Sequence, residues 1–437
     1  MSSFALSLNL SLTYSIIYLT MKGYKMRRII TSMDIGSNTI KIVVGEMIGE
    51  KINILCALNE ETKGFKNHEI IDEDLLKLQI RSMLDTISEQ LGCKVRKVIV
   101  NLPTSSNGFV ISEVTNTITN EDGIVTSNDI LRILQTSAYN KIRVNDELIG
   151  VMPIYFRLDN EEMLDPYEMS GKELSAKVVL ITAPRNEVVS MVSLLEKCGV
   201  EVIDITTTGL VDYYNFKNPK LDERTGIVVN IGHYKTSLSV FSKGLYINNE
   251  VLNIGGAYID RDISFIYKFK LTDCKYLKEN LALANIRKAN PKENVRLVNK
   301  TQEELTINQY ELTEIVASRL SEMLKLIKKS INLLTKKEIS YIIITGGLTE
   351  LKDFPLALAS VFGENVKIGS INTIGLRHNQ YSTALGMIRY FNEKLRLRHK
   401  EYSTFSEDDA ESMCTIDAKL IASDSILGKV FGYFFDS

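Results

Sequence analysis

The stretch GIVVNIG at residues 226–232, followed after a turn by TSLSVF at residues 236–241, decides the fold of this chain. Both runs are apolar and rich in β-branched residues, so they predict two strands joined as a β-hairpin. The same arrangement occurs earlier, where RRIITSMDI (27–35) and TIKIVVGEM (39–47) flank the turn Gly36-Ser37-Asn38. An internal repeat of one supersecondary unit predicts an α/β protein built by duplication.

The charge balance and the cysteine pattern exclude several classes of protein. The 437 residues contain 52 Lys and Arg against 54 Asp and Glu, a net charge of −2, so no overall positive field favours nucleic acid as a partner. The five cysteines include no C-x-x-C pair and the four histidines are scattered. This pattern argues against a disulfide framework or a zinc site and suits a reducing cytosol.

The first 25 residues differ from the rest. Residues 4–20 are moderately apolar, but Ser, Asn and Thr interrupt them and no positive segment precedes them. A bilayer span needs about 20 predominantly apolar residues. We therefore expect residues 1–25 to be an upstream extension from a mis-called start codon, rather than a signal peptide or an anchor.

Each predicted hairpin carries polar groups suited to phosphate. In DIGSNT (34–39), Asp34 can hold Mg²⁺, the glycine lets backbone amides approach phosphate oxygens, and the hydroxyls add donors. Alone, this motif is more often only a turn. The second hairpin offers Asn230, Gly232, Thr236 and Ser237 at equivalent places. Two such hairpins could clamp a triphosphate from opposite sides.

Two glycine pairs supply a third signal. Gly255-Gly256 precedes a predicted helix, and Gly346-Gly347 follows the run 340–345, which is typical of a buried parallel strand. Glycines at that edge let an adenosine lie flat against the backbone. The alternative is an ordinary strand–helix turn.

The second half of the chain adds a helical region and a tail. Residues 274–334 are expected to be mostly helical, with the longest helix over 308–334. Residues 397–423 are polar and acidic, which predicts a linker. Beyond it, Leu427, Val430, Phe431 and Phe434 form one apolar stripe of a short helix suited to a lipid headgroup boundary. The alternative is a tail that packs on its own body.

The order of D-x-G-S, a repeated hairpin, G-G and I-I-I-T-G-G resembles the actin-like ATPase superfold. Further stretches are similar to the FtsA family: DPYEMSG (165–171), EKCGVEV (196–202), NIGG (253–256) with Asp262-Ile263, and ITGG (344–347). The resemblance covers about 27–395 and the tail. It implies an α/β, actin-like two-lobed fold with duplicated ribonuclease-H-like cores and an FtsA-type inserted subdomain.

The resemblance also implies a division of the chain and a nucleotide site. The expected parts are subdomain 1A (26–106 and 184–223), inserted subdomain 1C (107–183), subdomain 2A (224–255 and 335–396), subdomain 2B (256–334), the linker (397–423) and a membrane-targeting helix (424–437). ATP and Mg²⁺ are expected between the lobes, with Asp34 at the metal. The expected contacts are Asp34, Gly36, Ser37, Asn38, Thr39, Lys41, Asn230, Gly232, Thr236, Gly255, Gly256, Lys278, Gly346 and Gly347.

The chain departs from the family pattern at the second hairpin. Asn230 stands where the family has an acid, and His233-Tyr234 replace glycines. An amide cannot supply the charge that orients Mg²⁺ or polarises an attacking water. Near the adenosine, Lys275 replaces a glutamate while Lys278 remains. We expect ATP binding with at most slow hydrolysis, and the sequence identifies no catalytic residue.

By resemblance, the chain is a membrane adaptor of the division septum, on the cytoplasmic face of the cell membrane. It would self-associate into filaments through subdomain 1C, bind the C-terminal tail of FtsZ, with Arg319 as the leading contact, and recruit other divisome proteins. The alternatives are a PilM-like assembly adaptor and a small-molecule kinase of the same superfold. We find no convincing catalytic base for a kinase, and an Hsp70-type chaperone would need more chain after residue 395.

Overall fold

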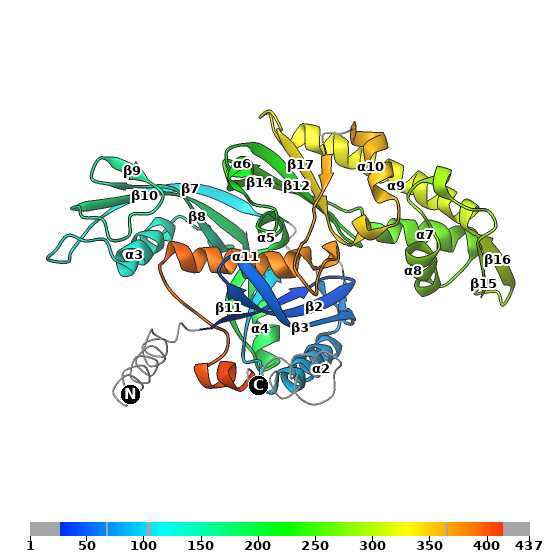
Figure 1. Ribbon diagram of the computed structural model, residues 1–437, viewed down its shortest axis with the longest axis horizontal. Helices are drawn as coiled ribbons and strands as arrows, with labels where there is room; N and C mark the ends of the chain where they lie inside the picture. Colours follow the sequence, from blue (N-terminus) through cyan, green and yellow to red (C-terminus); the bar gives the residue numbers. More distant parts are fainter. Residues whose placement is uncertain (1–26, 67–68, 103–105, 364–365, 414–437) are drawn as a thin grey trace, which may run out of the picture.

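The computed structural model describes residues 27–66, 69–102, 106–363 and 366–413, which form two lobes that each contain a five-stranded sheet (Figure 1). In the first lobe the strand order is β11 (Glu201–Thr207), β6 (Lys97–Leu102), β1 (Arg28–Ile35), β2 (Thr39–Ile48) and β3 (Lys51–Glu61). In the second lobe it is β14 (Leu245–Leu252), β13 (Thr236–Ser242), β12 (Thr225–Ile231), β17 (Tyr341–Thr345) and β18 (Val366–Ile368).

The two sheets share one topology. β1 runs antiparallel to β2 and parallel to β6, just as β12 runs antiparallel to β13 and parallel to β17. Strands β1 and β12 are almost wholly buried, as continuous apolar runs predict. The predicted duplication is therefore confirmed, and it places the ends of β1 and β12 in equivalent positions.

Helices cover the first sheet. α2 (Glu73–Leu91) and α4 (Arg185–Lys197) pack together, while α11 (Ser382–Leu397) lies on β1, β2 and β6 and against α5 (Thr208–Tyr213). Asp72 caps α2 by accepting a hydrogen bond from the Leu75 amide. The apolar side chains of α11 join the core of the first lobe. The expected subdomain 2A (335–396) includes α11 in the second lobe, and that assignment is wrong because helical periodicity does not reveal which sheet a helix covers.

The expected linker at 397–423 is also wrong over its described part. Residues 407–413 form a short helix, and Phe405, Ala410 and Met413 are buried in the core of the first lobe. The hydroxyl of Thr404 accepts a hydrogen bond from the Thr31 amide. The segment is polar and acidic on average, but its few apolar residues face the body, so average composition hid the packing.

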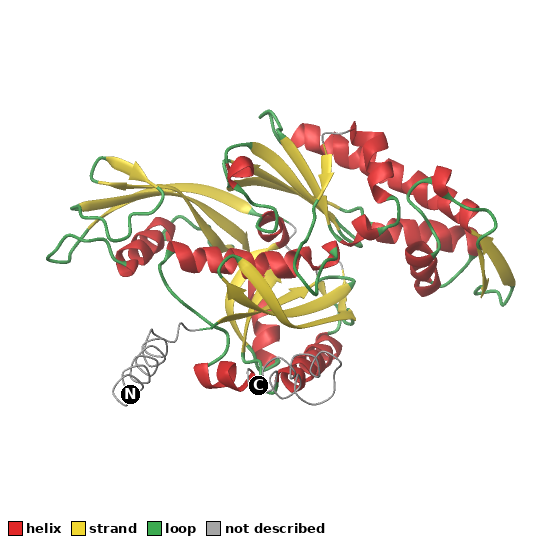
Figure 2. Cartoon of the chain, viewed as in Figure 1, coloured by secondary structure: helices red, strands yellow, loops and turns green. Residues whose placement is uncertain are grey.

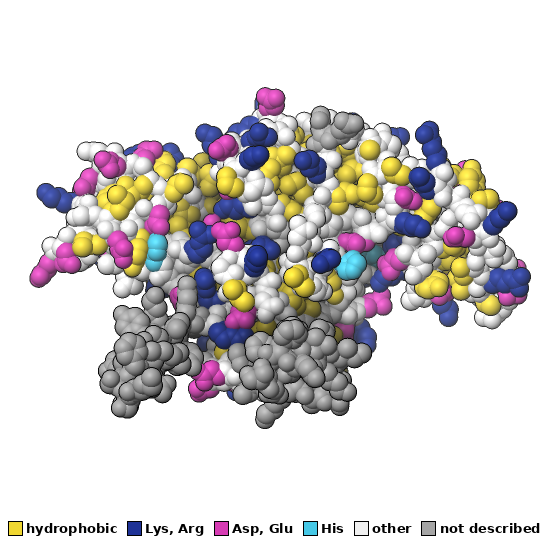
Figure 3. All heavy atoms as spheres, viewed as in Figure 1, with side chains coloured by type: hydrophobic (Ala, Val, Ile, Leu, Met, Phe, Trp, Pro, Cys, Tyr) yellow, Lys and Arg dark blue, Asp and Glu magenta, His cyan; other side chains and the backbone are white. Residues whose placement is uncertain are grey.

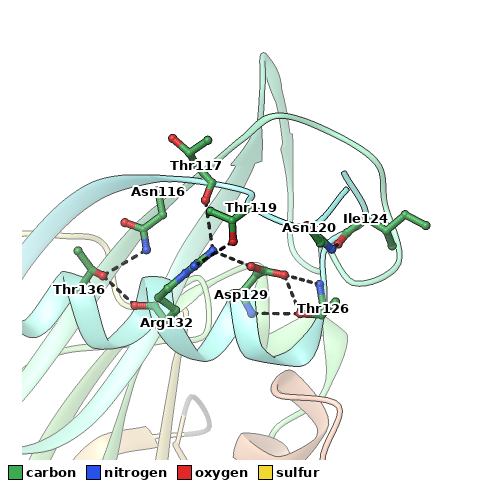
Figure 4. A network of polar contacts seen from close by, with 9 residues as sticks. All are labelled: Asn116, Thr117, Thr119, Asn120, Ile124, Thr126, Asp129, Arg132 and Thr136. Carbon is green, nitrogen blue, oxygen red and sulfur yellow. Dashed lines mark hydrogen bonds and ion pairs between the residues drawn. The ribbon is translucent and has the colours of Figure 1, made fainter. Parts of the chain in front are cut away.

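A smaller module is inserted in the first lobe and projects from it (Figure 1). Its sheet has the order β7 (Gly108–Thr117), β10 (Glu173–Pro184), β8 (Asp146–Leu158) and β9 (Glu161–Met163), with α3 (Ser127–Ala138) packed on β7 and β10. Figure 4 shows how α3 begins: Thr126 and Asp129 form a capping box, and Arg132 joins Asp129 to the Thr117 carbonyl.

The second lobe carries a mainly helical extension of α7 (Gly256–Tyr267), α8 (Leu271–Asn280) and α9 (Gln309–Leu334). The predicted longest helix is confirmed, with Asn308 as its N-cap. Residues 274–334 are mostly helical, as predicted, but between α8 and α9 the chain also forms an unpredicted hairpin, in which β15 (Asn294–Val298) pairs with β16 (Glu304–Asn308). Apolar residues alternate with polar ones through β16 and through the first four residues of β15, which is the strand period.

Helices flank both five-stranded sheets (Figure 2), and positive and negative side chains are interspersed over the face drawn in Figure 3. No helix of the described residues is long and apolar enough to cross a membrane. The shorter elements are β4 (Phe65–Lys66), β5 (Glu69–Ile70), α6 (Pro219–Asp222), α10 (Phe354–Phe362) and the 3-10 turns η1 (Ile286–Lys288), η2 (Gly347–Glu350) and η4 (Asn379–Tyr381).

Candidate nucleotide-binding cleft

A cleft of about 430 Å³ lies where the two hairpins and both glycine turns meet. This volume is within the range of roughly 300–1,000 Å³ that is usual for ligand pockets. Of the fourteen residues predicted to contact nucleotide, twelve line it: Asp34, Gly36, Ser37, Asn38, Thr39, Lys41, Asn230, Gly232, Gly256, Lys278, Gly346 and Gly347.

The remaining two, Thr236 and Gly255, are not among the residues that line the cleft. Thr236 is fully buried, and its hydroxyl donates to the Ile254 carbonyl at 2.8 Å. A Cβ on Gly255 would lie 2.5 Å from the His233 carbonyl oxygen, so this glycine permits a close approach of two backbone segments. Both residues shape the wall.

The first hairpin presents a buried acid. Asp34 is the penultimate residue of β1, where Lys41 Nζ lies 3.3 Å from its Oδ2 and Asn101 Nδ2 donates to its Oδ1 at 3.0 Å. Asn101 also donates to the Thr208 hydroxyl, while its own Oδ1 is buried without a hydrogen-bond partner among the described residues. Sequence reasoning missed Asn101, although a polar residue near the end of an apolar strand was a usable signal.

The second hairpin repeats the turn geometry of the first. The Gly36 amide donates to the Thr39 carbonyl at 3.0 Å, and the Gly232 amide donates to the Lys235 carbonyl at 3.0 Å. At the end of β12, Asn230 Nδ2 donates to Asp212 Oδ2 at 2.6 Å. Asp212 lies on α5 and is fully buried.

Asp212 is surrounded by neutral donors. Its Oδ1 accepts hydrogen bonds from Ser382 and Thr383, at 2.9 and 3.1 Å. Burial raises the pKa of Asp212 to about 7, with the charge of Asp34 acting in the same direction and the hydrogen bonds against it. Sequence reasoning missed Asp212, although it is the single charged residue between Asp204 and Lys217.

His233 occupies a place where the family pattern has glycine. The Ala257 amide donates to its carbonyl at 2.7 Å, which ties the second hairpin to the start of α7. Burial, together with Lys278, Lys275 and Arg261, lowers the pKa of His233 to about 3. The ring is therefore neutral near pH 7 and adds no positive charge to the cleft.

Lys278 is engaged in a buried ion pair. Its Nζ lies 2.8 Å from Asp260 Oδ1, and both side chains are more than nine-tenths buried. Asp260, on α7, was not predicted from the sequence. Lys275 lies 3.9 Å from Glu61 of the first lobe, which makes a long ion pair between the lobes.

The predicted partner contact and the predicted membrane residues do not belong to the cleft. Arg319 was expected to face a partner, but its guanidinium pairs with Asp262 and Glu322 of the same chain. Both ion pairs engage Arg319 within the chain, and its contact with a partner stays a prediction. The predicted membrane residues Leu427, Val430, Phe431 and Phe434, and the extension 1–25, lie outside the described residues.

The residues present suit a magnesium nucleotide. Mg²⁺ prefers oxygen ligands, and Asp34 and the unpartnered Asn101 Oδ1 supply such oxygens at one end of the cleft. Gly346 has a positive φ of 98°, and a Cβ there would lie 2.5 Å from Asn230 Oδ1. Glycine at this position therefore permits both the positive φ and the close packing of the turn on β12.

The comparisons with known proteins agree on one family. The family described as Cell division protein FtsA matches residues 227–386, and the SHS2 domain inserted in FtsA matches residues 109–182. The FtsA of Bacillus subtilis is 25% identical over 377 residues, covering 85% of both chains. The FtsA of Escherichia coli is 23% identical and covers 84% of this chain and 91% of its own.

Solved structures share the fold at lower identity. A PilM-PilN type IV pilus biogenesis complex aligns with a TM-score of 0.54 and 13% identity, covering 82% of this chain and 97% of that one. MreB5 of Spiroplasma citri bound to ADP aligns with a TM-score of 0.52 and 10% identity, covering 84% and 97%. These likenesses establish an actin-like fold.

Proposed function

We propose that this chain, which belongs to the FtsA family of actin-like cell-division proteins, binds ATP with Mg²⁺ and acts as a self-associating adaptor between the division ring and the membrane. The observation that carries the nucleotide part is the meeting of both hairpins and both glycine turns at one cleft. The convergence of four motifs that are distant in sequence at one cleft supports a shared ligand.

The residues of the cleft have separable tasks in this proposal. Backbone amides and hydroxyls of the two hairpins hold the phosphates, and Gly346-Gly347 faces the adenosine. Asp34 and Asn101 would hold Mg²⁺, which neutralises phosphate charge. Titration calorimetry of the full chain with ATP, with and without Mg²⁺, tests this part. Absence of binding under both conditions would contradict it.

We also propose that hydrolysis is slow. Asn230 cannot polarise water as a carboxylate does, and Asp212 lies behind it rather than on the cleft wall. We expect turnover well below about 1 s⁻¹, the lower end of usual enzyme rates. A faster phosphate release from purified protein would show that another group acts as the base.

The membrane part rests on the sequence of the tail. We propose that Leu427, Val430, Phe431 and Phe434 insert into the lipid headgroup region and that filaments, formed through the inserted module, bind by many tails at once. The expected partners are the acidic FtsZ C-terminal tail and other divisome proteins, at the cytoplasmic face of the septum.

Liposome co-sedimentation tests this part. Phe431→Glu should release the protein, because it places a charge in the centre of the apolar stripe, whereas a chain that begins at Met26 should still bind. The reverse result would make residues 1–25 the anchor.

The two rival functions receive less support. A PilM-like adaptor shares the fold, but the inserted module matches the SHS2 domain that is inserted in FtsA, at residues 109–182. A small-molecule kinase would need a catalytic base on the cleft wall. Phosphate transfer from ATP to small alcohols would reveal such a kinase directly.

A further inference from the structure

A fully buried carboxylate lies directly behind the cleft wall, and the proposed function leaves it without a role. Asp212 is not among the residues that line the cleft, but its two contacts Asn230 and Thr383 are. Burying an acid among neutral groups costs free energy, and an apolar or amide side chain of similar volume would avoid that cost. The position therefore calls for an explanation beyond packing.

We infer that Asp212 supplies, from behind the wall, the negative charge that the second hairpin lacks at Asn230, and that Asn230 transmits it to the magnesium nucleotide. This inference rests on the proposed nucleotide binding. Asp212 is a positioning residue, because it acts through Asn230 and does not touch the ligand.

The hydrogen bonds fix the direction of the amide. Asn230 uses Nδ2 as a donor to Asp212 Oδ2 at 2.6 Å, so its Oδ1 points elsewhere. That oxygen lies against the turn at Gly346, where a Cβ would come within 2.5 Å of it. Asn230 and Gly346 both line the cleft, and the inference places this oxygen at the wall that the ligand would meet.

A carboxylate that accepts a hydrogen bond from an amide makes the amide oxygen more negative. Carboxylates behind metal-binding side chains orient them and raise their basicity in the same way. Asn230 backed by Asp212 can therefore replace part of what an acid at position 230 would provide. Ser382 and Thr383 hold Asp212 from the other side, so the carboxylate cannot turn away.

The geometry makes the single substitution Asn230→Asp unfavourable for the folded protein. Asn230→Asp would place two carboxylates within hydrogen-bond distance in a buried site, where they cannot both ionise without a large cost. Asp212→Asn combined with Asn230→Asp exchanges the two groups instead. One amide and one carboxylate remain, and the Ser382 and Thr383 hydroxyls can act as acceptors as well as donors.

The test measures ATP affinity with and without Mg²⁺ by titration calorimetry, on the full chain at pH 8, which is above the raised pKa of Asp212, so that the carboxylate is ionised. The ratio of the two affinities reports the preference for the magnesium nucleotide and does not require turnover. Asp212→Asn should lower this ratio about tenfold or more, because even two unit charges about 12 Å apart in an effective dielectric of about 20 interact by the equivalent of a tenfold change. The exchange variant should recover the ratio of the original protein.

Asp222→Asn is the matched control. Asp222 accepts a hydrogen bond from Tyr213, the neighbour of Asp212 on α5, but it is not part of the cleft. The ratio of ATP affinities with and without Mg²⁺ should be the same for Asp222→Asn as for the original protein. If Asp212→Asn does not fold, the exchange variant still tests the inference. The inference requires that variant to fold and to keep the affinity ratio of the original protein.

The outcomes separate the two proposals. If the original protein binds no ATP, the proposed nucleotide binding fails and this inference fails with it. If the original protein binds ATP, but Asp212→Asn keeps the ratio or the folded exchange variant loses it, only the inference is overturned.

Discussion

Asp212 should make the stability of the protein depend on pH in an unusual direction. Its folded-state pKa is raised to about 7, whereas an exposed aspartate titrates near its ordinary value of 3.8. A raised folded-state pKa means that the folded protein holds this proton more tightly than the unfolded chain. The stabilisation is therefore complete below the unfolded pKa and is lost as pH rises through about 7.

The size of this loss of stability follows from the pH range between the unfolded and folded pKa values of Asp212. Between pH 5 and pH 7 the unfolded chain has lost this proton and the folded protein keeps it, so about 1.4 kcal/mol is lost per pH unit and roughly 2–3 kcal/mol in total. That loss is large beside a usual total stability of about 5–15 kcal/mol. Asp212→Asn has no such proton, so its free energy of unfolding should fall less over the same window.

Urea denaturation of both proteins at several pH values from 5 to 8 is the assay. The unfolding free energy of the original protein minus that of Asp212→Asn should decrease as pH rises from 5 to 8. Asp222→Asn corrects for other titrating groups. Parallel curves for the original protein and Asp212→Asn would refute the reasoning, because they would show that Asp212 is ionised throughout.

Two further predictions concern the cleft wall and the extension. Gly346→Ala should lower stability by about 2 kcal/mol or more, because a Cβ at φ 98° would also lie 2.5 Å from Asn230 Oδ1. Gly347→Ala is its control, since the nearest atom to a Cβ there is 4.0 Å away, and thermal melting distinguishes the two. Arg319→Glu should lower stability by about 1–3 kcal/mol even without a partner peptide, because it breaks the pair with Asp262. The exposed Lys329→Glu on the same helix should change stability by no more than about 0.5 kcal/mol, and equal effects would contradict this interpretation.

The sequence predicts local features of the cleft better than distant ones. Both hairpins are visible because apolar runs and glycine turns are local signals, and the turns at Gly36 and Gly232 have the expected form. The Asp212 site is different, because its partners come from β12 and α11, far along the chain. One sequence shows that Asn230 departs from the family pattern but not that an acid lies behind it.

The missed hairpin of β15 and β16 and the wrong lobe for α11 both come from the limits of local sequence patterns. The strands β15 and β16 have five residues each, and such short runs are easily missed between two longer helices. For α11, buried residues occur on nearly all sides of the helix, so periodicity could not indicate which lobe it covers.

The packing of the C-terminal segment changes how the membrane tail must be tested. Residues 403–413 belong to the first lobe: Thr404 bonds to β1, and Phe405 and Met413 are more than nine-tenths buried. Full burial of each large apolar side chain is worth about 1.5–3 kcal/mol, so a chain ending at residue 397 should lose several kcal/mol of stability. A chain ending at residue 423 keeps this segment and should unfold as the full chain does while losing liposome binding. Equal unfolding free energies for the chains ending at 397 and 423 would show that the segment adds nothing to the fold. Loss of liposome binding is therefore evidence about the tail only for the chain ending at 423, because the shorter one also removes part of the core.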